Sequence, residues 1–309
     1  MTAITSDLLV AAGPPPQSSR FRRWLRRLTP GQVINAVLLL ACSAIFIYPF
    51  IWLISASFKP RGQVFDNRII PRTFQPQNYQ TIWNAVPITS WLINSFIITA
   101  LAAVAVTISS GVVAWGFTYF NFRGRDKLFG VVLATMMLPG VVTMIPRFLI
   151  WSNLGLVGFN APMRGMMPMW AGNLFGSAFY IFMLRQFFRR LPRETFEAAR
   201  VDGAGNWRIF WQIGVPLARP AFVVTLLFEA NAAWNELQAA LIYLQDPSTF
   251  TVPRGMANVV ARFGVGGGGE ANWELVVTAA VITTLPLIIL FFIGQKQFID
   301  GIATTGSKG

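Results

Sequence analysis

The sequence predicts an all-α polytopic membrane protein with six transmembrane helices and both termini in the cytoplasm. Hydrophobic residues make up 54% of the 309 residues and charged residues only 12%, whereas about a quarter of the residues are charged in a soluble domain. Several uncharged apolar stretches are long enough to cross a bilayer as helices. Lys and Arg gather in the intervals that would share one side of the membrane, which is the positive-inside pattern.

The chain begins with a basic tail, residues 1–30, ahead of the first predicted span at residues 31–58. The arginines of the tail lie directly before this span, at Arg20, Arg22, Arg23, Arg26 and Arg27. They would hold the start of the span in the cytoplasm and meet anionic lipid there. The span is too long for the apolar region of a signal peptide, so we expect it to be retained. Residues 59–87 are polar and form an external loop.

The middle of the chain predicts two further spans on either side of a short basic loop. Residues 88–119 are rich in Ala, Ser, Thr and Gly, and small residues allow helices to pack closely in lipid. Residues 121–127 carry most of their charge as Lys and Arg and should be cytoplasmic. Residues 128–151 form the third span, in which Pro139 and Pro146 should kink or unwind the helix.

The second half of the chain continues this alternation of spans and loops. The predicted segments are an external turn at 153–164, a fourth span at 165–188, a charged loop at 194–220, a fifth span at 221–244, an external loop at 245–272 and a sixth span at 273–294. Residues 31–294 thus form the transmembrane domain, and residues 295–309 form a cytoplasmic tail. Tryptophans near the predicted boundaries should anchor the helices in the interface: Trp52, Trp83, Trp91, Trp151, Trp170 and Trp273.

The distribution of charge supports this topology and argues against nucleic acid as a partner. The formal net charge is +13, but the basic residues lie beside apolar segments and not on an amphipathic face. Membrane lipid is therefore the expected partner for them. The first external loop departs from the pattern, because it carries Lys59, Arg61, Arg68 and Arg72.

Composition also excludes several kinds of chemistry. The chain has no histidine and one cysteine, Cys42, which excludes an internal disulfide, histidine-based catalysis and a histidine–zinc site. The glycine-rich run at 264–269 lacks the Lys-Ser/Thr that completes a phosphate-binding loop. We therefore expect no metal, no cofactor and no ATP hydrolysis in this chain, and do not expect an enzyme.

The charged loop at 194–220 predicts two short helices joined by a glycine turn. Pro192 and Arg193 can open the first helix, and Glu194 and Glu197 suit its positive end; this helix should run to about Asp202. Gly203 and Gly205 then supply the freedom for a reversal. Asn206 is the expected N-cap of a second helix, Trp207 to Ile213. Gly214 and Pro216 are expected to stop that helix.

This loop resembles the EAA loop of ABC importer permeases. The matching residues are Glu197, Ala198, Ala199, Asp202, Gly203, Ala204, Phe210, Ile213, Pro216 and Pro220. The extended form is similar to carbohydrate importers of the maltose/trehalose type, and to their MalG-like subunit in particular. The resemblance covers the chain from about Thr29 to its end. It implies a type I ABC importer permease fold in the bacterial cytoplasmic (inner) membrane, and sugar import by alternating access.

The same resemblance implies partners and roles for the loop. The partners are a second, MalF-like permease subunit, a homodimeric cytoplasmic ATPase that holds ATP and Mg, and an extracytoplasmic sugar-binding protein. Within the loop, Glu197 would anchor to the ATPase by charge and Gly203 would allow the sharp turn. Phe210 and Ile213 would dock on the ATPase by apolar contact.

The fifth span carries polar residues that suit a transport path. At about 100° per residue, Glu229 and Glu236 fall on one face of a continuous helix, and Asn231, Asn235 and Gln238 on the opposite one. Trp234, Asn235 and Glu236 resemble the family's W-N-[DE] segment. One face could line a path for sugar hydroxyls and pyranose rings. Alternatively, these groups form hydrogen bonds between helices, or Glu236 reaches the outer headgroups.

The external loop at 245–272 is the second candidate contact. In MalG-like subunits a loop at this position reaches the binding protein, and the resemblance implies Asn258, Arg262, Gly266 and Gly267 as its contact zone. An ordinary flexible connector is the alternative. The C-terminal residues 297–309 are similar to the family's ending, which implies a tail that touches the ATPase.

Two other functions stay open on the sequence alone. An ion-coupled secondary transporter would show inverted repeats and paired intramembrane charges. The same ABC fold could also carry a non-sugar solute such as a polyamine or a glycerophosphate, and a path with two glutamates would suit a cation.

Overall fold

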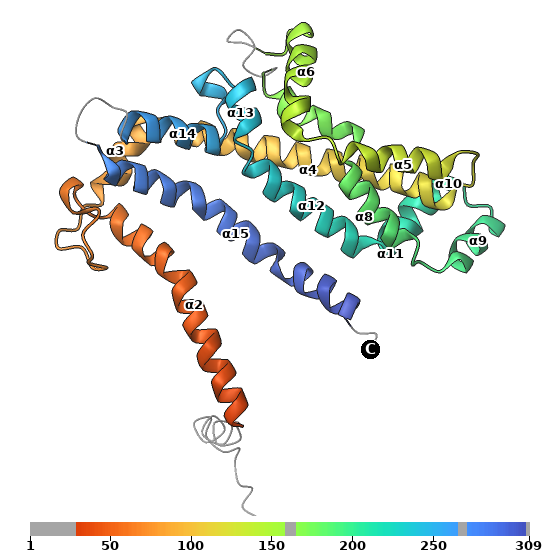
Figure 1. The fold of residues 1–309 in the computed structure, drawn as a ribbon, viewed down its shortest axis with the longest axis horizontal. Helices are drawn as coiled ribbons and strands as arrows, with labels where there is room; N and C mark the ends of the chain where they lie inside the picture. The colour runs from red at the N-terminus through yellow and green to blue at the C-terminus, as the bar shows by residue number, and fades with distance from the viewer. Residues whose placement is uncertain (1–28, 158–164, 265–270, 307–309) are drawn as a thin grey trace, which may run out of the picture. The chain divides into compact units, whose positions relative to one another are not determined.

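The computed structural model describes residues 29–157, 165–264 and 271–306, and every regular element in these ranges is helical (Figure 1). The chain forms two compact units, residues 1–54 and residues 55–309. The predicted all-α class is therefore confirmed for the described part of the chain.

The first unit contains most of one long apolar helix, α2 (Pro30–Ser57). Its 28 residues carry no charge and extend over about 42 Å at 1.5 Å per residue, which exceeds the roughly 30 Å hydrocarbon core of a bilayer. Its most apolar window buries none of its residues. A fully exposed apolar surface of this kind suits lipid and does not suit water. The prediction of a helical first span is confirmed.

The second unit is organised around α4 (Ile88–Tyr119), an apolar helix of 32 residues that corresponds to the predicted second span. Helices α8 and α12 pack along it (Figure 1). Small buried residues bring the backbones close: an added Cβ on Gly111 would lie 2.5 Å from the Phe222 ring of α12. The small residues therefore allow close helix packing, as predicted.

Two apolar cores lie along α4, one toward each of its ends. The first surrounds Trp91 and includes residues of α12, α14 and α15, and the second surrounds Trp115 and includes residues of α8, α9 and α10. Trp91 is only 1% exposed, so its predicted role as an interfacial anchor was wrong. Its indole fills the core against neighbours that lie far away in the sequence.

The predicted third span is a broken one. Helices α5 (Arg125–Thr135) and α6 (Gly140–Asn153) meet at an angle of 95°. Pro139 stands at the break as the N-cap of α6, in extended conformation, because proline cannot donate the hydrogen bond that a continuous helix would need. Pro146 lies inside α6 without ending it. The prediction of a disruption is confirmed at Pro139, and a kink at Pro146 stays a prediction.

The predicted fourth and fifth spans are less regular than expected. Residues 165–188 contain two short 3₁₀ turns, Met167–Met169 (η2) and Ala171–Phe175 (η3), before α8 (Ala178–Phe188). The fifth span divides into α12 (Arg219–Trp234) and α13 (Gln238–Tyr243). Neither is a single long helix, and both breaks lie where side chains of the chain itself bind the backbone, as described below.

The predicted external loops also contain helices. Residues 59–87 hold the 3₁₀ turn η1 (Arg61–Gln63) and α3 (Gln77–Ala85), and residues 245–272 hold the turn η5 (Pro247–Thr249) and α14 (Val252–Phe263). The last helix, α15 (Trp273–Gly306), continues through Pro286 and past residue 294, where a tail was predicted to begin.

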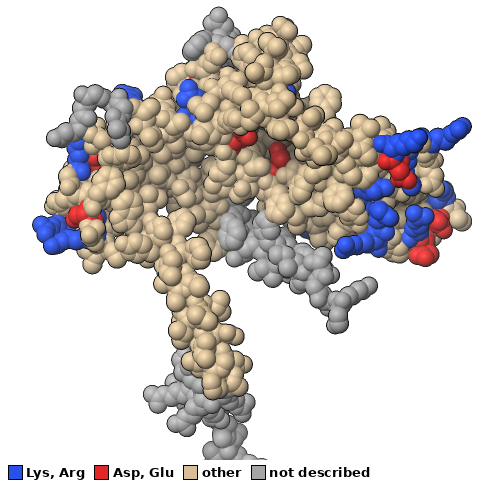
Figure 2. All heavy atoms as spheres, in the orientation of Figure 1, with Lys and Arg blue, Asp and Glu red and all other residues tan. Residues whose placement is uncertain are grey.

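Within the described ranges, α2 and α4 are each long and apolar enough to cross a membrane. Two bent helix pairs, Arg125–Thr135 with Gly140–Asn153 and Asn206–Leu217 with Arg219–Trp234, bring the number to four if each pair is one crossing. The count of six and the side of each terminus stay predictions. Figure 2 shows Lys and Arg at the end of the second unit that carries α5, α9 and α10 and also at its opposite end, with a mostly uncharged surface between the two.

The buried Lys59 explains why one basic residue of the 59–87 loop departs from the charge pattern. Its side chain is 0% exposed, and Nζ donates a hydrogen bond to Asp66 Oδ1 at 2.5 Å and another to the Arg68 carbonyl at 2.7 Å. Asn78 Nδ2 donates to the Lys59 carbonyl at 2.9 Å. The charge of Lys59 is therefore neutralised within the fold and does not act as a free positive charge.

This ion pair makes the 59–87 segment sensitive to acid. The hydrogen bond from Lys59 holds the pKa of the Asp66 carboxyl below its usual value of 3.8. A carboxyl with a lowered pKa stabilises the fold above its unfolded pKa, and this stabilisation is lost as the pH falls through the folded pKa. We expect the thermal unfolding midpoint to fall below about pH 4, and Asp66→Asn to remove that part of the fall. The check is a pH series in detergent, with Asp202→Asn as an exposed control; identical curves for both variants would contradict the assignment.

Candidate coupling loop and transport path

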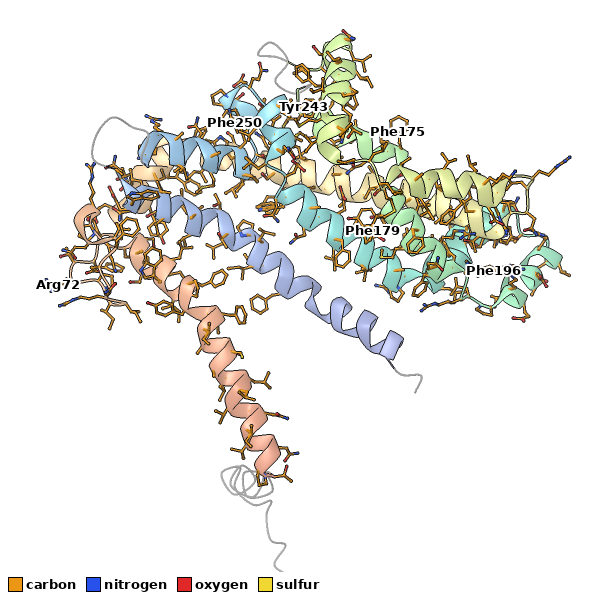
Figure 3. The ribbon with its side chains drawn as sticks, viewed as in Figure 1. Arg72, Phe175, Phe179, Phe196, Tyr243 and Phe250 are labelled. Atoms are coloured by element: carbon orange, nitrogen blue, oxygen red, sulfur yellow. The ribbon has the colours of Figure 1, made fainter. Side chains whose placement is uncertain are left out.

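The first helix of the charged loop is α9 (Arg193–Val201), close to the predicted Arg193–Asp202. Pro192 precedes it in extended conformation, and Glu194 lies in its first turn, where a carboxylate is favoured. Phe196 fixes the helix to the rest of the molecule, because its ring is 6% exposed and lies 5.1 Å from the Trp115 ring, centroid to centroid. Figure 3 shows Phe196 at the end of the second unit where the charged loop lies.

The turn after α9 is a Schellman motif centred on Gly203. The Ala204 N–H donates to the Ala199 carbonyl at 3.0 Å, and the Gly203 N–H donates to the Arg200 carbonyl at 3.0 Å. Gly203 has φ +80°, a left-handed conformation that glycine adopts without steric cost. The predicted role of Gly203 as the turn residue is confirmed in its geometry.

The second helix differs from the prediction. Gly205 and not Asn206 occupies the N-cap position, and Asn206 is the first residue of α10 (Asn206–Ile209). The helix does not stop at Gly214 or Pro216: it widens into a π-turn, η4 (Phe210–Gly214), and continues as α11 (Val215–Leu217). Pro216 is tolerated because it lies in the first turn of α11, where its missing N–H leaves no bond unmade.

The aromatic residues that this second helix exposes are not the ones that the sequence predicted. Phe210 is 1% exposed and packs against Trp115 at 5.8 Å between ring centroids, so it cannot provide an apolar docking surface as predicted. The exposed aromatic rings are Trp207 (64%) and Trp211 (46%), which the sequence analysis did not select. The signal for them in the sequence was the spacing of two tryptophans four residues apart, which puts both on one face of a helix.

The other matched residues of the loop lie mostly at its surface. Exposed are Glu197, Ala198, Asp202, Gly203 and Pro216, and half-buried are Ala199, Ala204 and Ile213. Together with Arg208 and Gln212, four of them line a cavity of about 250 Å³ between α9 and the second helix. The loop thus presents one concave surface edged by Asp202 and Arg208.

Glu229 on α12 joins three elements of the second unit. Its Oε1 accepts a hydrogen bond from Asn173 Nδ2 at 2.7 Å, and the same nitrogen lies 3.3 Å from the Ala102 carbonyl of α4. The Asn173 carbonyl in turn accepts from Ser109 Oγ at 2.9 Å. These bonds match the alternative that the sequence left open, in which polar groups hold helices together. Asn173 was missed, although it is a polar residue within a predicted span.

Removal of the Glu229 carboxylate should therefore reduce stability. We expect Glu229→Ala to destabilise by about 1–3 kcal/mol, because Asn173 would lose its acceptor. Glu229→Gln should stay near wild type, since its amide oxygen can accept the same bond. Thermal unfolding in detergent measures this, with the exposed Asn231→Ala as control. Equal midpoints for the Ala variant and wild type would show that the contact contributes little.

The helix α12 ends at the W-N-E segment and does not continue through it. The helix ends at Trp234, and Asn235 Nδ2 donates to the Asn231 carbonyl at 2.8 Å. The Glu236 carboxylate accepts from the Ala239 N–H at 2.8 Å, at the start of α13. The prediction that Glu229 and Glu236 share one face of a continuous helix was wrong. These short-range side-chain bonds to the backbone compete with the helix and end it.

A cavity of about 360 Å³ lies where this segment meets α14 and α15. Its lining is mainly apolar, with polar groups from Asn235, Thr283 and Thr284, and it includes the Trp234 ring. Trp234 is 4% exposed and lies 5.0 Å from the Phe96 ring. Of the predicted path residues, the structure brings together Trp234 and Asn235 at this cavity, while Asn231 is exposed one turn earlier on α12 and does not line the cavity.

The described part of the predicted external loop at 245–272 contains the helix α14 (Val252–Phe263). Asn258 and Arg262 lie on α14, and Arg262 Nη1 donates to the Ala85 carbonyl at 3.2 Å. Figure 3 shows Phe250 beside α14, where its ring packs under the Arg254 guanidinium at 4.4 Å. Gly266 and Gly267 lie outside the described residues. The contact zone stays a prediction, but its described part is an ordered helix.

These features define a helical membrane protein with a loop of two short helices joined by a glycine turn. Residues 103–303 match the family described as "Binding-protein-dependent transport system inner membrane component". The chain belongs to this family, and the predicted membership among ABC importer permeases is confirmed.

The chain is similar to individual relatives along most of its length. It is 30% identical to the probable ABC transporter permease protein YurM of Bacillus subtilis, over 85% of this chain and 84% of that protein. It is 30% identical to the lactose transport system permease protein LacG of Rhizobium radiobacter, over 90% of this chain and 97% of that protein. A crystal structure of a bacterial ABC transporter involved in the import of alginate aligns with a TM-score of 0.73 at 23% identity, over 92% of this chain and 99% of that one, and shows the shared fold.

Proposed function

We propose that this chain is one of two membrane subunits of an ATP-driven importer that moves a di- or oligosaccharide into the cytoplasm. The observation that carries the proposal is the loop at 194–220, in which a glycine-closed pair of helices presents a concave surface. A membrane subunit with such a projecting, rigid loop suits a lever that is moved from outside the membrane plane. The relatives that transport lactose and alginate favour a saccharide as the solute.

The proposed assembly has four kinds of component. A second, MalF-like permease completes the path, a homodimeric ATPase holds ATP and Mg, and an extracytoplasmic binding protein delivers the sugar. The membrane is the bacterial cytoplasmic membrane, which this chain crosses six times with both termini inside. Basic residues of α5, α9 and α10 then lie in the cytoplasm (Figure 2), as the positive-inside rule requires.

The cavity between Trp234, α14 and α15 is the proposed contribution of this chain to the sugar path. An indole and the Asn235 amide with two threonine hydroxyls offer the mixed apolar and hydrogen-bonding surface that a pyranose ring needs. Glu229 is assigned to helix packing and not to the sugar, because its carboxylate is already bound by Asn173.

The test measures transport in proteoliposomes that contain the importer. The importer is purified by capture of this chain together with the subunits that co-purify with it. We expect ATP-dependent uptake of an oligosaccharide from a panel that includes lactose and alginate oligosaccharides, and only with a binding protein present. Thr283→Val with Thr284→Val should raise the apparent KM for that sugar, whereas Thr81→Val, on α3, should not. Uptake by this chain alone under an ion gradient would contradict the proposal and favour a secondary transporter.

A further inference from the structure

Two neighbouring cavities lie where α4 and α8 end and α9 begins. One has a volume of about 160 Å³ and the other about 410 Å³, and both are lined by Thr118, Arg189 and Arg193. We call this region the basic basin. Its arginines are Arg125, Arg185, Arg189, Arg193 and Arg200.

The positive charge of the basic basin exceeds the negative charge that faces it. The carboxylates in its lining are Asp126 and Glu197. Asp126 Oδ1 is shared between Arg125 Nε at 3.2 Å and Arg185 Nη2 at 3.5 Å. Within the described residues, Arg189, Arg193 and Arg200 form no ion pair with a carboxylate. An anion that entered the basin would therefore meet a surplus of guanidinium groups.

Buried donors in the basin also lack partners. Arg185 is 8% exposed, its guanidinium lies 4.0 Å from the Phe129 ring centroid, and its Nε is buried without a hydrogen bond. Trp115 is 5% exposed, and its Nε1 is likewise buried and unbonded. Since a buried donor without an acceptor costs free energy, nearly all such groups in proteins have a partner. Trp115 lines the smaller cavity of the basin and Arg185 lines the larger one, and an unpaired buried donor in each indicates a ligand that is rich in oxygen acceptors.

The N-terminus of α9 adds to the positive potential of the basic basin. Arg193 is the first residue of α9 and lines both cavities, and no side chain caps the helix. The free N–H groups and the positive end of the helix dipole favour an anion at this position. Guanidinium groups bind phosphate oxygens in pairs, which gives them preference for phosphate over a simple halide.

We propose that the basic basin binds the phosphate group of an anionic phospholipid. The basin follows directly on the apolar length of α4, so under the proposed topology it lies at the depth of the inner headgroup layer, where basic pockets between helices bind such lipids. Because Arg193, Glu197 and Arg200 of α9 belong to its lining, a bound headgroup fixes the base of the coupling loop. The depth of the basin and this regulatory consequence rest on the proposed topology and function, whereas the binding measurement does not require transport.

The test measures binding directly on the purified importer complex, without transport. Native mass spectrometry and thermal shift in detergent compare added phosphatidylglycerol, phosphatidylcholine and inorganic phosphate. We expect phosphatidylglycerol to bind and to raise the unfolding midpoint, with phosphatidylcholine and phosphate ineffective. Arg189→Gln with Arg193→Gln should weaken this binding by roughly twenty-five-fold, since each arginine near an anionic surface contributes a factor of about five.

The matched control is Arg123→Gln with Arg208→Gln, which removes two exposed arginines of the same end of the molecule that do not line the basin. The control should keep the affinity of the wild type. An equal loss of lipid affinity in both double variants would show that general surface charge causes the effect, and this would overturn the proposal. A shift by inorganic phosphate as large as that by phosphatidylglycerol would overturn the lipid as ligand. Normal transport with no lipid binding would overturn this inference and leave the proposed function intact.

Discussion

Replacement of Gly203 by valine is expected to abolish the stimulation of ATP hydrolysis by loaded binding protein in the reconstituted importer. Gly203 has φ +80°, and a residue with a Cβ pays about 1–2 kcal/mol in this left-handed region, a β-branched one more. No atom lies within 4 Å of the position where a Cβ would stand. The cost therefore comes from the backbone alone and is relieved by opening the turn, which moves α10 relative to α9.

The matched control is Gly203→Asn, because asparagine tolerates the left-handed conformation much better than valine. Asparagine adds a side chain of similar size at the same exposed position. The control therefore separates an effect of the changed backbone turn from an effect of an added side chain on the contact surface. We expect the asparagine variant to keep most of the stimulation and the valine variant to lose it. Basal folding of both is checked by thermal unfolding in detergent. A valine variant that responds like wild type would show that the Schellman turn does not transmit the signal.

The elements that could be predicted from the sequence are those that local patterns determine. The apolar length of α2 and α4, the break at Pro139 and the turn at Gly203 follow from residue chemistry within a short window. The family followed from the spacing of the matched residues between Glu197 and Pro216. Each of these features depends on backbone conformation or on the membrane as solvent, and not on a distant partner.

The features that could not be predicted depend on contacts between residues far apart in the chain. Asn173 binds Glu229 across 56 positions, and no local pattern relates the two. Phe210 matches the family motif, but its burial against Trp115 is decided by how α4 and the loop pack. The composition of residues 245–272 indicates a flexible loop, whereas the structure fixes part of it against α4 by hydrogen bonds and close packing.

That fixed segment is held by side chains of α4. Asn94 Nδ2 donates to the Ser248 carbonyl at 2.8 Å and to the Phe250 carbonyl at 3.1 Å. The Val252 N–H donates to Ser95 Oγ at 2.7 Å, which begins α14 directly against α4. Trp91 Nε1 donates to the Pro247 carbonyl at 3.1 Å. The backbone that leads into α14 therefore has a defined position on the face of α4.

At Gly255 the helix α14 lies close against Trp91 of α4, and Gly255→Ala is expected to damage the fold. An added Cβ would lie 2.2 Å from Trp91 Cε3 and 2.4 Å from Cδ2. In an isolated helix the change would stabilise by about 1 kcal/mol. Here the clash should prevail, at about 1–3 kcal/mol or more, because the indole is 1% exposed and its Nε1 is bonded, so it cannot move aside.

A double-mutant cycle tests this contact. Trp91→Leu alone should destabilise by leaving a cavity, but Gly255→Ala added to it should cost little, because the ring that it would strike is gone. Gly62→Ala, at an exposed glycine with no atom within 4 Å of the added Cβ, is the control and should stay near wild type. The unfolding midpoint in detergent and the rate of proteolysis between α13 and α15 are the measurements. If the two substitutions simply added, the cost of Gly255→Ala would not come from the Trp91 ring. If Gly255→Ala cost little in the wild-type background, α14 would be free to shift away from α4, and the flexible-loop interpretation of residues 245–272 would regain its support.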